Sequence, residues 1–465
     1  MEKYDIGLIG LGVMGRNFIL NMAEKGFSAI GYDLDKEKVK ILEKDSGKLN
    51  VKGVNSLDEF LDNLQKPRKV MLLVPAGAVE GVLDDLVPAL DEGDLIIDGG
   101  NSHPGDTENR MARAADKKLK YLGVGISGGS DGARHGPSMM PGGDPEAWKL
   151  VQGIFEAAAA KVKDEPCVTY LGKSSAGHFV KMVHNGIEYG IMEMLAEVYD
   201  LCKRGLKMNN DEIHDMFATW NEGKLSSFLV EITSHIFTRK DEEKPGYLID
   251  HIKDTAKQKG TGKWTSQLAM DLQVPVPTID MAVSMRHLSA YKNDRKNASD
   301  RFPGPVSVIK EDKDNFIPKL ENAVYFGMLI TFAQGMEMLR VASDEKDFGL
   351  NLADVAKIWR GGCIIRAALL EDLMQIFDEN PKLNNLLLAD SLQSDLNRYE
   401  KDTRIILGHA LKAGIPVPSL SASLGFFDAY RSEHLPDNLI QAQRDYFGSH
   451  TYERVDEDGV FHTDW

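Results

Sequence analysis

The first 125 residues alternate between short apolar runs and segments with the 3.6-residue period of an amphipathic helix. The apolar runs, which have the length of buried strands, are residues 6–9, 27–32, 69–74, 95–98 and 121–125. Residues 13–24 follow the helical period between the first two runs. This strand–helix–strand order predicts an α/β domain of the Rossmann type, with a doubly wound parallel sheet, over residues 1–177.

The pattern changes after residue 177, where strand signals stop and long amphipathic segments follow one another. These segments are residues 178–204, 211–238, 264–271, 318–343, 352–376 and 391–413. They predict a large all-helical domain over residues 178–435. The last segment, residues 436–465, has little periodicity, but Tyr446, Phe447 and Trp465 give it apolar anchors. We therefore expect this tail to dock onto another surface instead of remaining disordered.

A glycine-rich motif, Gly10-Leu11-Gly12-Val13-Met14-Gly15, follows the first predicted strand and begins the first predicted helix. Its glycines permit a tight turn and a close backbone approach to a pyrophosphate, which the helix N-terminus then binds. Asp33 stands about 20 residues further on, at the end of the second predicted strand, where an acidic residue can bind a ribose. The combination predicts a dinucleotide coenzyme.

The residues around Asp33 also predict which coenzyme is preferred. The Asp33 carboxylate can accept hydrogen bonds from the ribose hydroxyls of NAD, but it repels the 2′-phosphate of NADP. Leu34 and Asp35 follow it, so the usual phosphate-binding arginine is missing, although Lys36 and Lys38 offer partial compensation. The sequence predicts that NAD is preferred over NADP.

Four polar residues of the segment 177–189 share one face of the predicted helix, because Lys181, His184, Asn185 and Glu188 stand at i, i+3, i+4 and i+7. A solvated polar stripe is one explanation. An acid–base site is the other, since a desolvated lysine can take a proton from a hydroxyl group. A carboxyl group with a raised pKa can return a proton to carbon later.

This segment resembles the catalytic helix of the decarboxylating 6-phosphogluconate dehydrogenases, and the resemblance extends along nearly the whole chain. The other motifs that carry it, in the same order as in the family, are residues 98–102, 127–134, 136–143, 258–265, 359–366 and 441–450. Several long motifs in one order are more specific than a glycine pattern alone.

The resemblance implies the oxidative decarboxylation of 6-phospho-D-gluconate to D-ribulose 5-phosphate and CO2, a reaction of the pentose phosphate pathway. Lys181 would be the general base at the C3 hydroxyl group, and Glu188 would protonate C1 of the enediol. The substrate residues that the family implies are Asn101, Ser127, Gly128, Gly129, His184, Asn185, Tyr189, Lys259, Thr261, Arg286, Arg444 and His450. The coenzyme residues are Gly10, Gly12, Val13, Met14, Gly15, Asp33, Val74, Ala76 and Asn101.

In the family, the tail that holds Arg444 and His450 reaches into the partner subunit, so the resemblance also implies a homodimer. The chain departs from the family at residues 33–35, where Asn-Arg-Thr is usual and Asp-Leu-Asp stands here. This departure agrees with the predicted preference for NAD.

Two alternatives remain open at this point. Another β-hydroxyacid dehydrogenase, acting on a non-phosphorylated acid, would not need the proposed phosphate ligands Lys259, Thr261, Arg286 and Arg444. A catalytically silent NAD-binding protein would not need both Lys181 and Glu188.

Composition sets further limits. A chain of 465 residues is long enough for two or three domains. Its net charge of −16 argues against a nucleic-acid or anionic-membrane partner, while a local basic patch can still bind a small anion. No apolar stretch reaches the roughly 20 residues of a membrane helix, and no signal-peptide pattern precedes the first strand. The three cysteines, Cys167, Cys202 and Cys363, suggest neither a disulfide framework nor a metal site. We expect a cytoplasmic enzyme without a metal.

Overall fold

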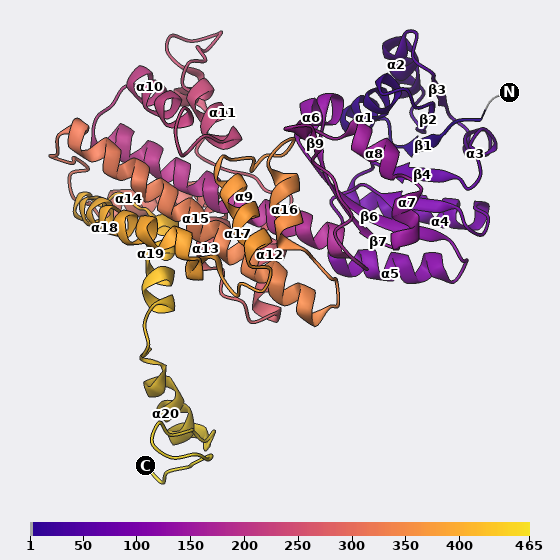
Figure 1. Cartoon of the computed structure of the whole chain (residues 1–465). Helices are drawn as coiled ribbons and strands as arrows, with labels where there is room; N and C mark the ends of the chain where they lie inside the picture. The colour runs from indigo at the N-terminus through magenta and orange to yellow at the C-terminus, as the bar shows by residue number, and fades with distance from the viewer. Residues whose placement is uncertain (1–2) are drawn as a thin grey trace.

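The structure is a computed structural model that describes residues 3–465. Met1 and Glu2, which belong to the segment where we expect no signal peptide, lie outside the described residues. Figure 1 shows an α/β unit at the N-terminus, a larger helical body, and a C-terminal tail that projects from that body. Within residues 3–465, no helix combines the length and the apolar character that crossing a membrane requires.

Seven strands form the sheet of the α/β unit, and the first six run parallel. They are β1 (Ile6–Ile9), β2 (Ala29–Tyr32), β3 (Val51–Val54), β4 (Lys69–Leu72), β5 (Leu95–Asp98), β6 (Lys120–Ser127) and β7 (Ser138–Gly143). Their order across the sheet is β3-β2-β1-β4-β5-β6-β7, and β7 pairs antiparallel to β6. A two-stranded hairpin of β8 (Lys161–Val162) and β9 (Glu165–Pro166) follows.

Helices cover both faces of this sheet. They are α1 (Val13–Glu24), α2 (Lys36–Ser46), α3 (Leu57–Asp62), η1 (Ala76–Ala78), α4 (Val79–Ala89), α5 (Pro104–Ala115), α6 (Gly129–His135), α7 (Pro145–Lys149) and α8 (Gln152–Ala158). Ile6 and Leu8 of β1 point into a core shared with α1, α2 and α8, while Ile9 points into a core shared with α3 and α4. Both faces are buried, which is why these strands read as continuous apolar runs. The predicted doubly wound parallel fold is confirmed.

The sequence prediction missed two strands of the seven-stranded sheet and the short β8–β9 hairpin. β3 contains Lys52 and Gly53, so it gives no apolar run. β7 contains Pro141, Gly142 and Gly143, which are poor strand formers. β7 is the last strand of the sheet, and on its outer side it makes only isolated bridges to Val168 and Gly172, so the order that a central strand requires is relaxed there.

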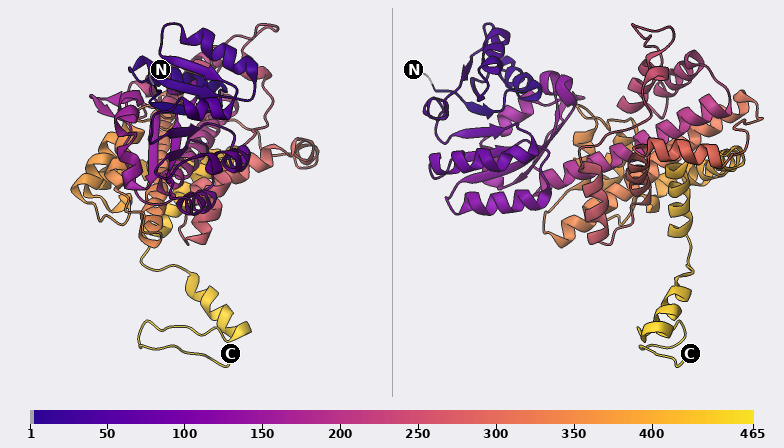
Figure 2. Two further views of the ribbon diagram at one scale, coloured as in Figure 1. Left: turned by 90° about the vertical axis from the view of Figure 1, so that its right-hand side faces the viewer. Right: turned by 180° about the vertical axis from the view of Figure 1, so that it is seen from behind.

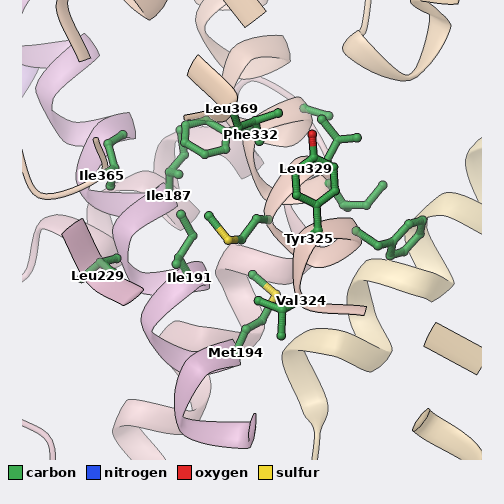
Figure 3. Packing of buried hydrophobic residues seen from close by; sticks show 14 of the residues in the cluster. Ile187, Ile191, Met194, Leu229, Val324, Tyr325, Leu329, Phe332, Ile365 and Leu369 are labelled. Carbon is green, nitrogen blue, oxygen red and sulfur yellow. The ribbon is translucent and has the colours of Figure 1, made fainter. Parts of the chain in front are cut away.

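The helical body is built around two long helices, α9 (Ala176–Asp200) and α15 (Lys313–Glu345). Figure 3 shows Ile187, Ile191 and Met194 of α9 facing Val324, Leu329 and Phe332 of α15. The other elements of the body are η2 (Leu201–Gly205), α10 (Asn210–Asn221), α11 (Phe228–Ile236), η3 (Leu248–His251), α12 (Thr261–Asp271), α13 (Pro277–Ser289), α14 (Lys292–Arg301), α16 (Leu352–Trp359), α17 (Leu369–Glu379), η4 (Leu386–Leu388), α18 (Asp390–Ala413) and α19 (Pro418–Tyr430).

Two segments predicted as continuous amphipathic stretches are each two helices. Residues 211–238 divide into α10 and α11, because Ser227 caps a new helix by accepting a hydrogen bond from the Val230 N–H. Residues 352–376 divide into α16 and α17 at Gly361-Gly362, where Gly362 has a φ of 67° that favours glycine. The predicted all-helical character of this region is confirmed.

The tail contains a twelve-residue helix, α20 (Asp437–Gly448), so the prediction of little periodicity was wrong there. Figure 1 and Figure 2 show this tail extending away from the helical body on a short linker, with the last residues folded back beside α20. In a single copy of the chain, the tail therefore does not pack on the body from which it emerges.

Candidate active site

The turn between β1 and α1 is tight on one side and open on the other. Gly10 has a φ of 101°, and an added Cβ there would lie 2.6 Å from the backbone oxygen of Leu73. A Cβ on Gly15 would lie 1.9 Å from the backbone oxygen of Gly10. At Gly12, in contrast, an added Cβ would meet nothing within 4 Å. The turn thus leaves the N-terminus of α1 accessible to a ligand.

Asp33 lies beside this turn and fixes it. Its carboxylate accepts hydrogen bonds from the N–H of Leu11 at 2.8 Å and from the N–H of Asp35 at 2.9 Å. Lys38 Nζ lies 3.3 Å from the same carboxylate. These contacts hold the end of β2 against the glycine turn, with the Asp33 side chain on the wall of the adjoining cavity.

The cavity next to Asp33 has a volume of about 470 Å³. Of the predicted coenzyme residues, Gly10, Asp33 and Val74 line it, while Val13 is exposed at the start of α1 and Ala76 lies in η1 beside it. Other lining residues that the sequence prediction did not name include Tyr32, Leu57, Asp85 and Leu86. Asp85 gave no sequence signal, because it is one of several acidic residues on the amphipathic helix α4.

A second polar cluster lies where β5 ends. The buried Asp98 carboxylate accepts hydrogen bonds from the Gly100 N–H at 3.0 Å, the Ser102 hydroxyl at 2.8 Å and Arg110 Nη1 at 3.0 Å. Asp98 is fully buried, so these donors compensate for its lost hydration. These hydrogen bonds hold the turn that carries Asn101 at the carboxyl end of β5.

His178, near the start of α9, connects this turn to the helical body. Its Nδ1 lies 2.7 Å from the Thr107 hydroxyl, and its Nε2 lies 3.1 Å from the backbone oxygen of Asp98. Burial lowers the pKa of His178, which favours the neutral ring. Because a carbonyl oxygen only accepts, we infer that Nε2 carries the hydrogen and that Nδ1 accepts from Thr107. The sequence prediction missed this role, although His178 stands one helical turn before Lys181.

Lys181 is 7% exposed, and its aliphatic stem crosses β6 where Gly125 leaves room for it. An added Cβ on Gly125 would lie 2.3 Å from the Lys181 Cβ. The Nζ atom lies 2.8 Å from Asn185 Oδ1 and 3.5 Å from His184 Nδ1. Burial lowers the pKa of Lys181, against the opposing charge of Glu188. A solvated polar stripe is therefore excluded for this face of α9.

His184 is fully buried between α9 and the sheet. Its Nε2 lies 3.2 Å from the Ser127 hydroxyl, and its ring packs edge-on against Trp359 at 5.7 Å. Burial, followed by the positive charge of Lys181, holds its pKa well below the ordinary value. The Ser127 hydroxyl also accepts a hydrogen bond from the Ile364 N–H at 3.4 Å. Gly128 and Gly129 continue the turn from Ser127 into α6.

Glu188 lies two turns after Lys181 on α9. Burial raises the pKa of its carboxyl group, against the opposing charges of Lys181 and Arg286. The two residues thus have pKa values shifted toward each other. This is the arrangement that lets one helix supply both a base and an acid near neutral pH.

Further predicted substrate residues meet next to Glu188. Tyr189 is buried against Gly262 of α12, where an added Cβ would lie 2.4 Å from the tyrosine ring. Arg286 of α13 stacks over this ring, at 3.9 Å from its centroid. Lys259 is exposed in the loop before α12, which begins at Thr261.

One small pocket lies between the sheet and the helices, where the turn that carries Asn101 meets α9 and α12. It is lined by Asn101, Ser102, His178, Lys181, Met182, Asn185, Thr261 and Trp264. Arg444 and His450 do not lie there, because both are exposed on the projecting tail. Of the predicted catalytic and substrate residues, this pocket brings together Asn101, Lys181, Asn185 and Thr261.

Comparisons with known proteins match both large regions of the chain. The family model for the "NAD binding domain of 6-phosphogluconate dehydrogenase" matches residues 5–172, and that for the "6-phosphogluconate dehydrogenase, C-terminal domain" matches residues 177–465. The chain is similar to the decarboxylating 6-phosphogluconate dehydrogenase of Lactococcus lactis strain IL1403, with 47% identity over 100% of this chain and 99% of that protein. It is equally similar, at 47% identity over 100% of both chains, to the NADP(+)-dependent, decarboxylating enzyme of Bacillus subtilis strain 168.

A solved structure of Plasmodium falciparum 6-phosphogluconate dehydrogenase, described in its apo form and in complex with NADP+ and with 6-phosphogluconate, has a TM-score of 0.97. It shares 43% sequence identity, and the match covers 99% of this chain and 100% of that one.

Proposed function

Because this chain belongs to the 6-phosphogluconate dehydrogenase family, we propose that Lys181 and Glu188 perform the acid–base steps of its reaction. The enzyme oxidises and decarboxylates 6-phospho-D-gluconate to D-ribulose 5-phosphate and CO2, with reduction of NAD(P). The observation that supports the roles of the two residues is the burial of Lys181 and the partial burial of Glu188 on one face of α9, with opposite pKa shifts.

In the first step, the neutral Nζ of Lys181 takes the proton of the substrate C3 hydroxyl group. Asn185, whose Oδ1 lies 2.8 Å from Nζ, orients the amine for this transfer. When bound, the nicotinamide coenzyme supplies the hydride acceptor. The neutral ring of His184, together with Ser127 and Asn101, binds the carboxylate and hydroxyl groups of the substrate.

In the second step, Lys181 carries the proton that it has taken and donates a hydrogen bond to the new ketone oxygen. A β-keto acid loses CO2 readily when positive charge stabilises the developing enolate. The proton of Lys181 passes to the enolate oxygen to give the enediol. The protonated carboxyl group of Glu188 then delivers a proton to C1 while Lys181 takes back the enediol hydroxyl proton, leaving the ketone. Burial favours the protonated form of Glu188 at this point.

The substrate phosphate is the proposed ligand of Tyr189, Lys259, Thr261 and Arg286, completed by Arg444 and His450 of a partner subunit. Arg286 already stacks on Tyr189, which orients its guanidinium group for a bidentate contact. We therefore propose a homodimer in which each tail completes the other subunit's site. The exposure of Tyr446 (69%) and Phe447 (73%) on a tail that leaves its own body supports this.

The coenzyme cavity fits a dinucleotide, and we propose that NAD is preferred. The open face at Gly12 suits a pyrophosphate, and Asp33 retains free lone pairs for ribose hydroxyls besides its two backbone contacts. A 2′-phosphate bound there would face the Asp33 carboxylate, while Leu34 offers no positive charge. Of the two lysines that could offset this repulsion, Lys36 and Lys38, the second is already paired with Asp33.

We also propose the domain division 1–177, 178–435 and 436–465, and a cytoplasmic location. The first is supported by the change from sheet to helices at α9 and by the linker before α20. The second is supported by Cys167, Cys202 and Cys363, which are buried free thiols in the described part of the chain.

A spectrophotometric assay tests the function. Reduced nicotinamide should form with 6-phosphogluconate and not with gluconate, with release of one CO2 per coenzyme reduced. Activity with gluconate instead would favour a different β-hydroxyacid dehydrogenase, and inactivity with both would favour a silent coenzyme-binding protein. Running the assay with NAD and NADP separately also measures the proposed preference.

A further inference from the structure

One carboxylate forms the centre of the C-terminal tail. Asp445 lies on α20 and has no exposed surface, although its neighbours Arg444 and Tyr446 are exposed. Its Oδ1 accepts hydrogen bonds from the Thr451 N–H at 2.9 Å and from His462 Nδ1 at 2.8 Å. Its Oδ2 accepts from the Thr463 N–H at 3.0 Å and from Trp465 Nε1 at 2.9 Å.

These four contacts fold the last residues back onto α20. Residues 452 and 461 exchange two backbone hydrogen bonds of 2.9 and 2.8 Å, and the Tyr452 hydroxyl lies 2.6 Å from that of Thr463. The Trp465 ring packs 6.2 Å from the ring of Tyr446. The result is a compact terminal unit that stands apart from the helical body (Figure 2).

This unit has almost no apolar core of its own. Asp445 is the one residue of α20 that is buried, so hydrogen bonds to its carboxylate hold the unit together. Buried hydrogen bonds to a charged acceptor are stronger than neutral ones, and losing the acceptor leaves several donors unsatisfied. The fold of the tail therefore depends on this side chain to an unusual degree.

The two proposed phosphate ligands of the tail lie on either side of this centre. Arg444 directly precedes Asp445 on α20, and its Nη1 donates to Gln441 Oε1 at 3.0 Å. His450 directly precedes Thr451, whose N–H binds Asp445, and its ring packs against Phe447 at 6.0 Å. The spacing between the two ligands is thus set by the contacts of Asp445.

We propose that Asp445 is a positioning residue, which folds the tail into one unit so that Arg444 and His450 reach the partner subunit's substrate phosphate in a fixed geometry. This inference rests on the proposed function, in which the tail completes the partner's site. It adds that the tail arrives already folded, so that little ordering entropy is lost when substrate binds.

The test is Asp445→Asn in the full-length enzyme, which keeps the shape of the side chain but removes its charge. We expect KM for 6-phosphogluconate to rise about tenfold, the effect of losing about 1.4 kcal/mol of binding, while kcat and the coenzyme KM change less than about twofold. The matched control is Asp456→Asn, an exposed tail carboxylate that pairs only with Arg454, and it should leave KM unchanged. An unchanged KM in Asp445→Asn would overturn the proposal.

A second set of variants tests whether Asp445 acts on substrate binding only through Arg444 and His450. In an Arg444→Ala/His450→Ala enzyme, adding Asp445→Asn should raise KM by less than about twofold, because the groups that it positions are absent. A tenfold rise in this background as well would overturn the proposal, since Asp445 would then act by another route. If Arg444→Ala/His450→Ala alone leaves KM unchanged, the proposed tail-delivery function fails, whatever Asp445 does.

Two further measurements are the oligomeric mass and the rate of trypsin cleavage in the tail. Analytical ultracentrifugation of Asp445→Asn should give the same mass as the unchanged enzyme, and trypsin should cleave after Arg454 faster. A variant that loses its partner subunit would show that Asp445 acts through assembly, which overturns the positioning role. A tail that resists trypsin as well as the unchanged one would also overturn it.

Discussion

His178 Nε2 lies 3.1 Å from the backbone oxygen of Asp98, and this contact joins the helix that carries Lys181 to the strand end that carries Asn101. The other ring nitrogen binds Thr107 of α5, so both sides of the imidazole are fixed. His178 therefore helps to fix the distance between the proposed base, Lys181, and the end of β5.

Replacing His178 with phenylalanine should disturb both stability and catalysis. The Thr107 hydroxyl and the Asp98 carbonyl lose their partner, which costs about 1–3 kcal/mol of folding free energy. We expect kcat to fall about tenfold or more, because small displacements at a reacting centre are costly. Denaturant unfolding and steady-state kinetics measure the two effects. A matched His178→Gln variant can still donate to the Asp98 carbonyl and should lose less of both.

Lys181→Met and Glu188→Gln should each lower kcat by about 10²- to 10⁴-fold, the usual contribution of a general base or acid. Glu193→Gln is the matched control, because Glu193 lies on the same helix and also has a pKa raised by burial. It should keep kcat within about twofold, since it has no proposed role in the chemistry. Losses as large in Glu193→Gln as in Glu188→Gln would remove the argument for Glu188.

The pH dependence of kcat/KM should be bell-shaped. The competent enzyme has neutral Lys181 and protonated Glu188, so activity falls at low pH, where Lys181 keeps its proton, and at high pH, where Glu188 loses its proton. Burial lowers the first pKa and raises the second, and both shifts increase the population of this form. In Glu188→Gln, the residual activity should rise with pH to a plateau without the alkaline fall. A bell-shaped pH profile that persists in Glu188→Gln would contradict the role of Glu188 as the general acid.

Exchanging the residues after β2 should reverse the coenzyme preference. In Asp33→Asn/Leu34→Arg, an amide replaces the carboxylate that repels a 2′-phosphate, and a positively charged guanidinium group is added. We expect the ratio of kcat/KM for NADP to that for NAD to rise by about 10²-fold, which corresponds to about 2.7 kcal/mol. Glu43→Gln, an exposed carboxylate on α2, should leave this ratio unchanged. An enzyme that already prefers NADP before the exchange would refute the predicted preference.

Mixing two defective subunits, assayed at a substrate concentration below KM, should reveal where the tail acts. In a hybrid of Lys181→Met and Arg444→Ala subunits, one site combines Lys181 with Arg444 of the other subunit and is intact. We expect hybrids formed by refolding a mixture to regain about half of the activity per dimer, since one of two sites is complete. If the tail served its own subunit, both sites would be defective and no activity would return.

The fold of the tail should loosen as pH rises through the raised pKa of His462. The hydrogen bond that His462 donates to Asp445, reinforced by the charges of Asp445 and Asp464, raises the pKa of His462. A free histidine has a pKa of about 6.5, so this stabilisation is complete below that value and is lost as pH rises through the higher folded pKa. Trypsin cleavage after Arg454, normalised to a reference peptide at each pH, should accelerate over that interval. His462→Gln should abolish this dependence.

Several features followed from local sequence. The apolar runs predicted most of the parallel strands, because strands buried on both faces must be apolar along their whole length. The spacing of Lys181, His184, Asn185 and Glu188 placed them on one helix face, since helical geometry needs no tertiary information. β7 and the break between α16 and α17 escaped prediction, because an edge position and a chain reversal at Gly362 depend on distant neighbours.

By itself, the sequence determined the α/β and helical character of the two large regions, the glycine turn with Asp33, and the polar face of the helix after residue 177. The tertiary structure decided which of these groups are buried and which share a pocket. Gly125 of β6 leaves space for the aliphatic stem of Lys181. His178 of α9 hydrogen-bonds the last residue of β5, and Asp445 accepts hydrogen bonds from the last residues of the chain. A pKa shift or a fixed distance arises from packing between residues far apart in sequence, and local periodicity carries no record of that packing.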